Sequence, residues 1–152
     1  MGRLLIVTHG PVDPGVPNPG ISSWEIEDIN NCVVKLYSEK PPRVICGTGK
    51  RHEETAKLLG LMITAYSPLV GNADIVISNE SVILADGTKL EYRMYSCLGD
   101  DPELVKTMLS PLLKTNGESI VIADPELIKG LDIKHPKLAT VYRFMMSGSV
   151  EL

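Results

Sequence analysis

Three short runs of apolar residues stand out along the chain, and each is nearly continuous rather than alternating. They lie within residues 3–8, 43–46 and 119–123. Such runs are typical of strands that are buried on both faces of a parallel sheet. A helical stretch is expected after each run, and a strand reached through a helical crossover returns parallel to its predecessor. We therefore predict an α/β fold in which a mainly parallel sheet carries these strands side by side, with helices on both faces.

The first predicted helix begins at Ser22, because Glu25 three residues later completes a capping box. It ends before Pro41-Pro42, which cannot continue a helix. The residues expected to form its buried stripe, at helical spacing, are Ile26, Ile29, Val33, Leu36 and Tyr37.

The other helices are predicted from caps and helix-ending residues. One covers residues 50–59 and is ended by Gly60. Two more, from residue 101 to about 114 and from 124 to near 130, both open with Asp-Pro-Glu, which supplies an N-cap, a helix-first proline and an acidic first turn.

The middle of the chain has a different pattern. Asp86-Gly87 is a strong hairpin signal between the stretches 81–85 and 89–95. We expect this hairpin to project from the main sheet or to cover the mouth of a pocket. Residues expected to touch a ligand there are Tyr92, Arg93 or Tyr95.

Three further stretches complete the predicted elements. Residues 75–77 are expected to form a strand, residues 63–72 an irregular segment, and residues 139–146 a last strand at an edge of the sheet. No repeat or linker divides the chain, so residues 1–152 are interpreted as a single domain.

Composition and charge narrow the function classes. A formal net charge of −4 and a pI near 5.4 give no electrostatic case for nucleic acid or an anionic membrane. No signal peptide or membrane-spanning run is found, so a cytoplasmic location is expected. The cysteines, Cys32, Cys46 and Cys97, are odd in number and widely spaced, which fits reduced thiols rather than a disulfide framework or a zinc site. We expect no metal and no cofactor.

His9 is the first candidate for chemistry. It follows the first apolar run directly and precedes Gly10 and a long proline-rich loop. Ligands of open α/β sheets bind at the carboxyl ends of the strands, where this histidine is predicted to lie. The alternative is a structural imidazole held by a hydrogen bond.

Gly47-Thr48-Gly49-Lys50 invites comparison with a phosphate-binding loop. The Walker pattern would need glycine at position 44 and Ser or Thr at position 51, where this chain has Val44 and Arg51, so we reject a nucleotide triphosphatase. Free amides at the start of the helix, with Lys50 or Arg51, would still suit an anion. The alternative is that both cations are solvated surface residues.

Three blocks of the sequence carry a resemblance to a known family, and they lie at residues 5–10, 44–56 and 119–131. In this order they resemble the histidine phosphatase (phosphoglycerate mutase-like) superfamily. Leu5-Ile6-Val7-Thr8-His9-Gly10 is similar to its opening Arg-His-Gly strand. Residues 44–56 resemble its second block, in which an arginine is followed four and five residues later by Thr-Ala, as Arg51 is by Thr55 and Ala56. Residues 119–131 resemble its third block, a strand, a His-Gly turn and a helix.

The resemblance implies a three-layer α/β/α fold with a phosphate pocket at the strand ends. It implies that His9 attacks phosphorus and becomes phosphohistidine, and that Arg51 binds the phosphoryl oxygens. Gly10 and Thr48 are further candidates for contact with the phosphate. The partner implied is a phosphorylated small molecule or phosphate ion, and association into a homodimer is left open.

The sequence departs from the family at three positions. Thr8 stands in place of the first arginine, and Asp124 in place of the second histidine. The usual acid position falls near residues 69–71, which carry no carboxylate; Asp74 and Glu80 are nearby but unmatched.

Asp124 is therefore either a catalytic residue or the N-cap of the helix that Pro125 begins. His52 and His135 are expected at the surface. Three functions remain open: a weak phosphatase for phosphomonoesters or phosphohistidine, a degenerate relative that binds phosphate for regulation, and an interaction protein with a vestigial pocket.

Overall fold

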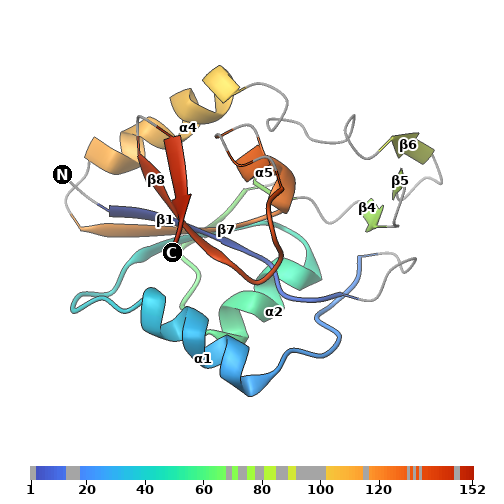
Figure 1. Ribbon diagram of the computed structural model, residues 1–152, viewed down its shortest axis with the longest axis horizontal. Helices are drawn as coiled ribbons and strands as arrows, with labels where there is room; N and C mark the ends of the chain where they lie inside the picture. The colour runs from blue at the N-terminus through green and yellow to red at the C-terminus, as the bar shows by residue number, and fades with distance from the viewer. Residues whose placement is uncertain are drawn as a thin grey trace.

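The computed structural model describes residues 3–12, 18–67, 70–71, 75–77, 81–84, 89–91, 102–114, 117–129, 131, 133, 135–145 and 148–152 (Figure 1). Its main sheet has six strands in the order β3-β2-β7-β1-β8-β9. The three predicted strands are central neighbours: β2 (Arg43–Cys46), β7 (Glu118–Ala123) and β1 (Arg3–Thr8). β7 pairs in parallel with both β1 and β2, which confirms the predicted parallel core of the sheet.

The two ends of the sheet differ from the prediction. A two-residue strand, β3 (Ala65–Tyr66), pairs in parallel with β2 inside the stretch expected to be irregular. β8 (Val141–Met145) was expected at an edge, but it lies between β1 and β9 (Gly148–Glu151), antiparallel to both. The prediction was wrong because β9 is short and holds one large apolar residue, Val150, so it carries no apolar run.

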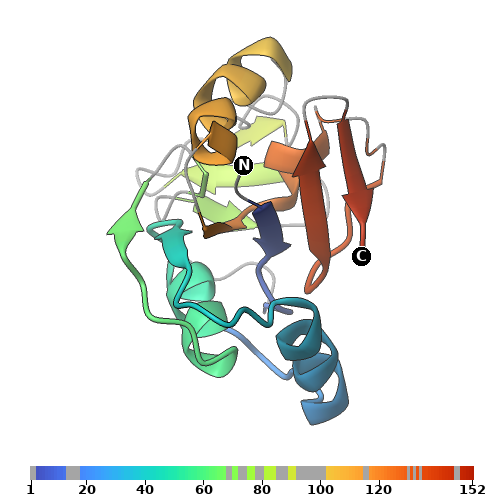
Figure 2. The ribbon, with the colours of Figure 1, turned by 90° about the vertical axis from the view of Figure 1, so that its left-hand side faces the viewer.

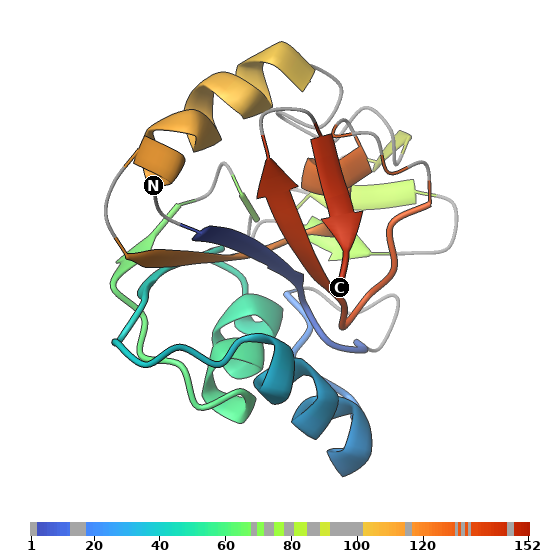
Figure 3. The same ribbon diagram turned by 60° about the vertical axis from the view of Figure 1, so that its left-hand side comes forward.

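Two hydrophobic cores lie on opposite faces of the sheet, because successive side chains of a strand point to opposite sides. Leu4 and Ile6 of β1 belong to one core, and Leu5 and Val7 belong to the other. α4 (Pro102–Lys114) and α5 (Pro125–Lys129) cover the first face, whereas α1 (Ile26–Lys35) and α2 (Lys50–Leu58) cover the second (Figures 2 and 3). The arrangement is the expected three-layer α/β/α sandwich.

α1 begins four residues later than predicted. Residues 21 and 22 are held in extended pairing with the preceding loop: Ile21 bridges Val12, and the Ser22 amide donates to the Pro11 carbonyl at 2.8 Å. That pairing excludes them from a helix. The buried stripe consists of Ile29, Cys32 and Leu36, while three residues expected to be buried are exposed: Ile26, Val33 and Tyr37.

The predicted hairpin is confirmed as part of a separate antiparallel sheet, in the order β4-β5-β6. Its strands are β4 (Ile75–Ile77), β5 (Ser81–Leu84) and β6 (Lys89–Glu91). The turn at Asp86-Gly87 and the expected ligand contacts of Tyr92, Arg93 and Tyr95 lie outside the described residues, as do Asp101 and Cys97. Within the described part of the chain, no helix has the length and hydropathy needed to cross a membrane.

Candidate functional site

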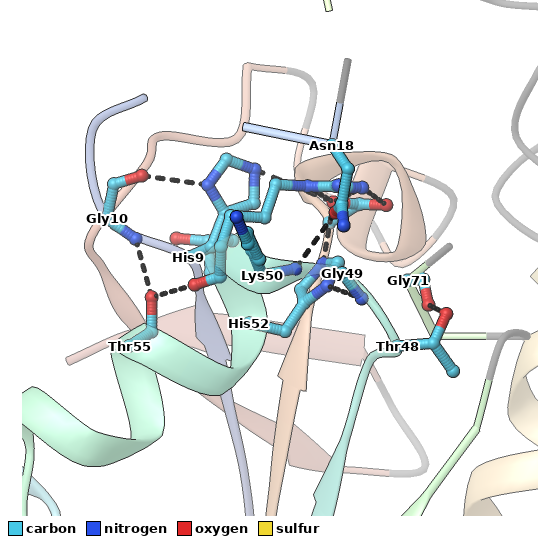
Figure 4. A network of polar contacts seen from close by, with 12 residues as sticks. His9, Gly10, Asn18, Thr48, Gly49, Lys50, His52, Thr55 and Gly71 are labelled. Atoms are coloured by element: carbon cyan, nitrogen blue, oxygen red, sulfur yellow. Dashed lines mark hydrogen bonds and ion pairs between the residues drawn. The ribbon is translucent and has the colours of Figure 1, made fainter. Parts of the chain in front are cut away.

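Three parallel strands deliver polar side chains to one edge of the main sheet. His9 follows β1, Arg51 and His52 begin the helix that follows β2, and Asp124 follows β7. Because β2, β7 and β1 are parallel neighbours, their carboxyl ends meet, as expected for a ligand site of an open α/β sheet. All four side chains are buried, and they form one polar network (Figure 4).

Arg51 and Asp124 form the centre of this network. Arg51 Nε donates to Asp124 Oδ1 at 2.9 Å, and Arg51 Nη2 donates to Oδ2 at 2.8 Å. Two parallel charge-assisted hydrogen bonds of this kind are the strongest form of arginine–carboxylate contact. Arg51 is fully buried, so the hypothesis of a solvated surface cation is wrong.

Asp124 stands at the predicted helix start, but its side chain does not cap the helix. Its backbone stands directly before Pro125, which begins α5 as predicted, and its carbonyl accepts from the Leu127 amide. Its carboxylate, however, points away from the helix start to Arg51 and His52. The role of a side-chain cap is therefore replaced by a role in the buried network.

His52 was expected at the surface and is wholly buried. The Gly49 amide donates to His52 Nδ1 at 3.1 Å, so Nδ1 carries the lone pair and Nε2 carries the hydrogen. His52 Nε2 then donates to Asp124 Oδ1 at 2.8 Å. The ring lies against glycine backbone: a Cβ at Gly71 would come within 2.3 Å of Nε2, and one at Gly47 within 2.6 Å of the ring.

The sequence held one signal for His52, which is the cluster of glycines before it. The glycines at 47 and 49 leave room for a ring folded back over the turn, but Gly71, which completes the slot, is distant in sequence. A histidine in a helix that also carries Lys50, Glu53 and Glu54 resembles a surface residue by composition alone.

His9 has the opposite tautomer. Its Nδ1 lies 2.8 Å from the Gly10 carbonyl oxygen, which can only accept, so Nδ1 carries the hydrogen and Nε2 carries the lone pair. Nε2 has no hydrogen-bond partner among the described residues and lies 3.5 Å from Asp124 Oδ1. The lone pair of a buried imidazole is thus directed at the centre of the network.

Burial controls the protonation of both histidines. It lowers the pKa of His9 to about 4, against the opposing pull of Asp124, so the ring is neutral at pH 7. Burial likewise lowers the pKa of His52. For Asp124, burial alone would raise the pKa, but His52, Arg51 and His9 hold it well below its usual range. Arg51 is charged at any ordinary pH, so it keeps this carboxylate ionised even when both rings are neutral.

Thr55 and Gly10 tie the end of β1 to α2. The Gly10 amide donates to Thr55 Oγ1 at 3.0 Å, and that hydroxyl donates to the Arg51 carbonyl at 2.6 Å (Figure 4). Trp24 covers the other side of Gly10, where a Cβ would come within 2.8 Å of the indole. Gly10 therefore positions His9 through its backbone, and its amide is already occupied.

Three backbone amides at the start of α2 have hydrogen-bond partners within the protein. The Thr48 amide donates to the Gly71 carbonyl at 2.9 Å, and the Lys50 amide donates to Asn18 Oδ1 at 3.0 Å. The Gly49 amide is taken by His52. Thr48 Oγ1 also lies on the Gly71 carbonyl, at 3.3 Å. These three amides therefore have partners within the protein, and the expected anion binding at the helix start stays a prediction.

Thr8, which stands in place of the arginine that the resemblance requires, joins the end of β1 to the segment that precedes β8. Its hydroxyl donates to the Lys137 carbonyl at 2.6 Å and accepts from the Thr140 amide at 3.0 Å.

Asp74 and Glu80, the unmatched carboxylates, lie outside the described residues. Among the described residues no cluster of His, Cys, Asp and Glu side chains is arranged to hold a metal ion.

Comparison with solved structures supports the fold inferred from the three sequence blocks. Matches include open reading frame Rv3214 of Mycobacterium tuberculosis, with TM-score 0.62 and 14% identity over 99% of this chain and 95% of that one. A phosphoglycerate mutase of Thermus thermophilus gives 0.62 and 14% over 99% and 98%, and Bacillus stearothermophilus YhfR gives 0.56 and 13% over 99% and 95%.

Comparisons of sequence find less. No family model matches the chain, and no curated protein matches it. At this level of identity the solved structures establish a phosphoglycerate mutase-like fold, which confirms the fold that the resemblance implied. The roles of the site residues rest on the geometry of this chain.

Proposed function

We propose that the protein is a slow phosphatase that transfers a phosphoryl group to His9 Nε2 and then to water. The observation that carries the proposal is the state of His9. Its hydrogen is fixed on Nδ1 by the Gly10 carbonyl, and its pKa is lowered to about 4. Its Nε2 lies at the end of a central strand, 3.5 Å from Asp124 Oδ1, which is itself paired with Arg51. A neutral imidazole held in one tautomer is what a nitrogen nucleophile requires.

The proposed reaction has two steps on this one atom. The Nε2 lone pair forms the N–P bond while the bond from phosphorus to the leaving group breaks, and the electron pair departs with the leaving group. The oxygen of water then forms a bond to phosphorus while the N–P bond breaks. The N–P electron pair returns to Nε2, and the proton lost by water leaves with the phosphate or passes to solvent. In both steps the Gly10 carbonyl holds the hydrogen of Nδ1 and stabilises the positive charge that develops on the ring.

Two features of the site support slow turnover. Thr8 leaves one expected arginine missing, and each such electrostatic contact is typically worth about 10²-fold or more in rate. Asp124 is ionised and paired with Arg51, so it is not available to protonate the leaving group, and general acid catalysis contributes roughly 10²–10⁴-fold. The substrates proposed are therefore aryl phosphates, phosphoramidates and phosphohistidine, whose leaving groups depend less on an acid.

A second candidate, anion binding without turnover, is favoured by one observation. The charge of Arg51 is already matched by Asp124 inside the network, which weakens the attraction for any anion. Turnover suffers more than weak binding does, because catalysis requires that the transition state be held more tightly than the bound substrate. In that case the pocket serves recognition or regulation.

Steady-state hydrolysis of an aryl phosphate, a phosphoramidate and a sugar phosphate tests the proposal. We expect slow hydrolysis of the first two, lost in His9→Ala and kept in His135→Ala, whose side chain is exposed. No hydrolysis of any of them, together with saturable phosphate binding, would favour the second candidate. Fast hydrolysis of the sugar phosphate, lost in His9→Ala, would contradict the proposed slow turnover and would show that Asp124, Asp74 or Glu80 supplies a general acid.

A further inference from the structure

The site contains an anion of its own. Asp124 Oδ1 accepts from Arg51 Nε at 2.9 Å and from His52 Nε2 at 2.8 Å, and it lies 3.5 Å from His9 Nε2. Nitrogens from three side chains therefore surround one carboxylate oxygen. Arg51 also uses the fork of donors with which arginine binds carboxylates and phosphates alike.

We infer that the Asp124 carboxylate is an internal ligand of this anion site and occupies the place between His9 and Arg51 that a phosphoryl group would take. The inference rests on the proposed function in one respect, which is that this cluster is the phosphate site. It goes beyond that function because it makes Asp124 an autoinhibitory group, neither a catalytic acid nor a helix cap.

Charge and geometry both support this assignment. Asp124 places an anionic side chain directly on Arg51, and the pair is nearly closed to solvent. A phosphate dianion entering beside His9 would lie within a few ångströms of an ionised carboxylate and would have to compete for the same guanidinium. Like charges at that distance in a buried site repel strongly.

The carboxylate is held in place by its backbone as well. The Asp124 amide donates to the Val70 carbonyl at 3.0 Å, and Pro125 follows as the first residue of α5. Displacement of the carboxylate therefore requires either a rotation of its side chain or a movement of this junction. In the resting protein the site has an occupant, and external oxyanions bind weakly.

Asp124→Asn tests the inference, because the amide keeps the size of the carboxylate and removes its charge. Its oxygen can still accept from Arg51 and His52, but its NH₂ cannot accept from Arg51, so the guanidinium loses one acceptor and the negative charge that balances it. The matched control is Asp28→Asn, which removes the same charge from the exposed face of α1. The probes are inorganic phosphate and vanadate, titrated by calorimetry and by thermal unfolding.

We expect Asp124→Asn to bind both anions at least about tenfold more tightly than the wild type, a small part of the repulsion that the lost charge exerts at this distance. The control should bind like the wild type, and Arg51→Met in the Asp124→Asn background should abolish the gain. A folded Asp124→Asn protein with no gain overturns the inference. If the variant unfolds in chloride, phosphate at equal ionic strength should refold it, and failure to do so overturns the inference equally.

The outcomes separate this inference from the proposed function. Tighter binding without turnover supports the internal ligand and contradicts the phosphatase. Turnover in the wild type that disappears in Asp124→Asn supports the phosphatase and overturns the internal ligand, because Asp124 would then take part in the reaction.

Discussion

The burial of a neutral His9 predicts that stability declines in mild acid. An imidazole whose pKa is about 4 in the folded protein and about 6.5 in the unfolded chain binds fewer protons when folded between those pH values. Protons therefore favour the unfolded state in this range, and stability is lost as pH falls from about 6.5 toward 4. At about 1.36 kcal/mol for each pH unit, His9 alone accounts for about 3 kcal/mol between pH 7 and pH 4.

His9→Asn isolates this contribution. The asparagine amide can still donate to the Gly10 carbonyl, as His9 Nδ1 does, but it does not titrate. Urea unfolding followed by the fluorescence of Trp24, the single tryptophan, gives the free energy of unfolding at each pH. The variant is expected to be less stable than the wild type at pH 7 because it leaves a cavity, and the difference should shrink by about 3 kcal/mol at pH 4.

The change with pH, rather than the absolute stability, is the informative quantity. His52, whose pKa is also lowered by burial, leaves a residual slope of the same sign in the variant. His135→Asn, at an exposed position, is the matched control and should follow the wild-type curve. Parallel curves for wild type and His9→Asn from pH 7 to pH 4 would refute the reasoning, because His9 would then titrate alike in both states.

Two further substitutions test the network by urea unfolding at pH 7. Arg51→Met leaves the Asp124 carboxylate buried without its cation and should lower the free energy of unfolding by about 3–5 kcal/mol. Its control is Lys50→Met, at the exposed neighbouring position, which should change the free energy of unfolding by less than about 0.5 kcal/mol. Equal effects of the two substitutions would contradict the buried pair. Thr55→Val removes the acceptor of the Gly10 amide and should lower the free energy of unfolding by about 1–3 kcal/mol. Its control is Thr107→Val, because the exposed Thr107 hydroxyl also donates to the carbonyl four residues before it; this substitution should cost less. A cost at Thr107 as large as at Thr55 would show that the Gly10 contact contributes nothing.

The central strands of the sheet could be predicted because a strand that is buried on both faces requires an uninterrupted run of apolar residues. The apolar runs of β1, β2 and β7 have no polar interruption, and their helical crossovers imply the parallel order. The strands at the two ends of the sheet have no such apolar run, since both residues of β3 are exposed and β9 is half polar. The start of α1 was misplaced because the pairing of Ile21 with Val12 depends on how the preceding loop folds, and the local capping pattern contains nothing about it.

The site was partly predictable for a similar reason. His9 follows the first apolar run, Asp124 follows the third, and Arg51 lies in the first turn of the helix after the second, so topology alone brings them to one edge of the sheet. What the sequence does not contain is the pairing among them. The local sequence around Asp124 fits either a helix N-cap or a catalytic residue. Its hydrogen bonds to Arg51 join residues 73 positions apart in the chain, and no local pattern contains them. His52 was missed because its slot is completed by Gly71, nineteen residues further on.

The central claim is that His9 Nε2 is the atom that accepts a phosphoryl group, with Asp124 as the occupant that limits access to it. The most direct measurement is to incubate wild type, Asp124→Asn and His9→Ala with a phosphoramidate, quench in alkali, and locate the phosphoryl group by peptide mass spectrometry and ³¹P NMR. The account predicts phosphohistidine at His9 Nε2 in the wild type, more of it in Asp124→Asn, and none in His9→Ala. Absence of label at His9 in both the wild type and Asp124→Asn, or equal label in His9→Ala, would contradict it.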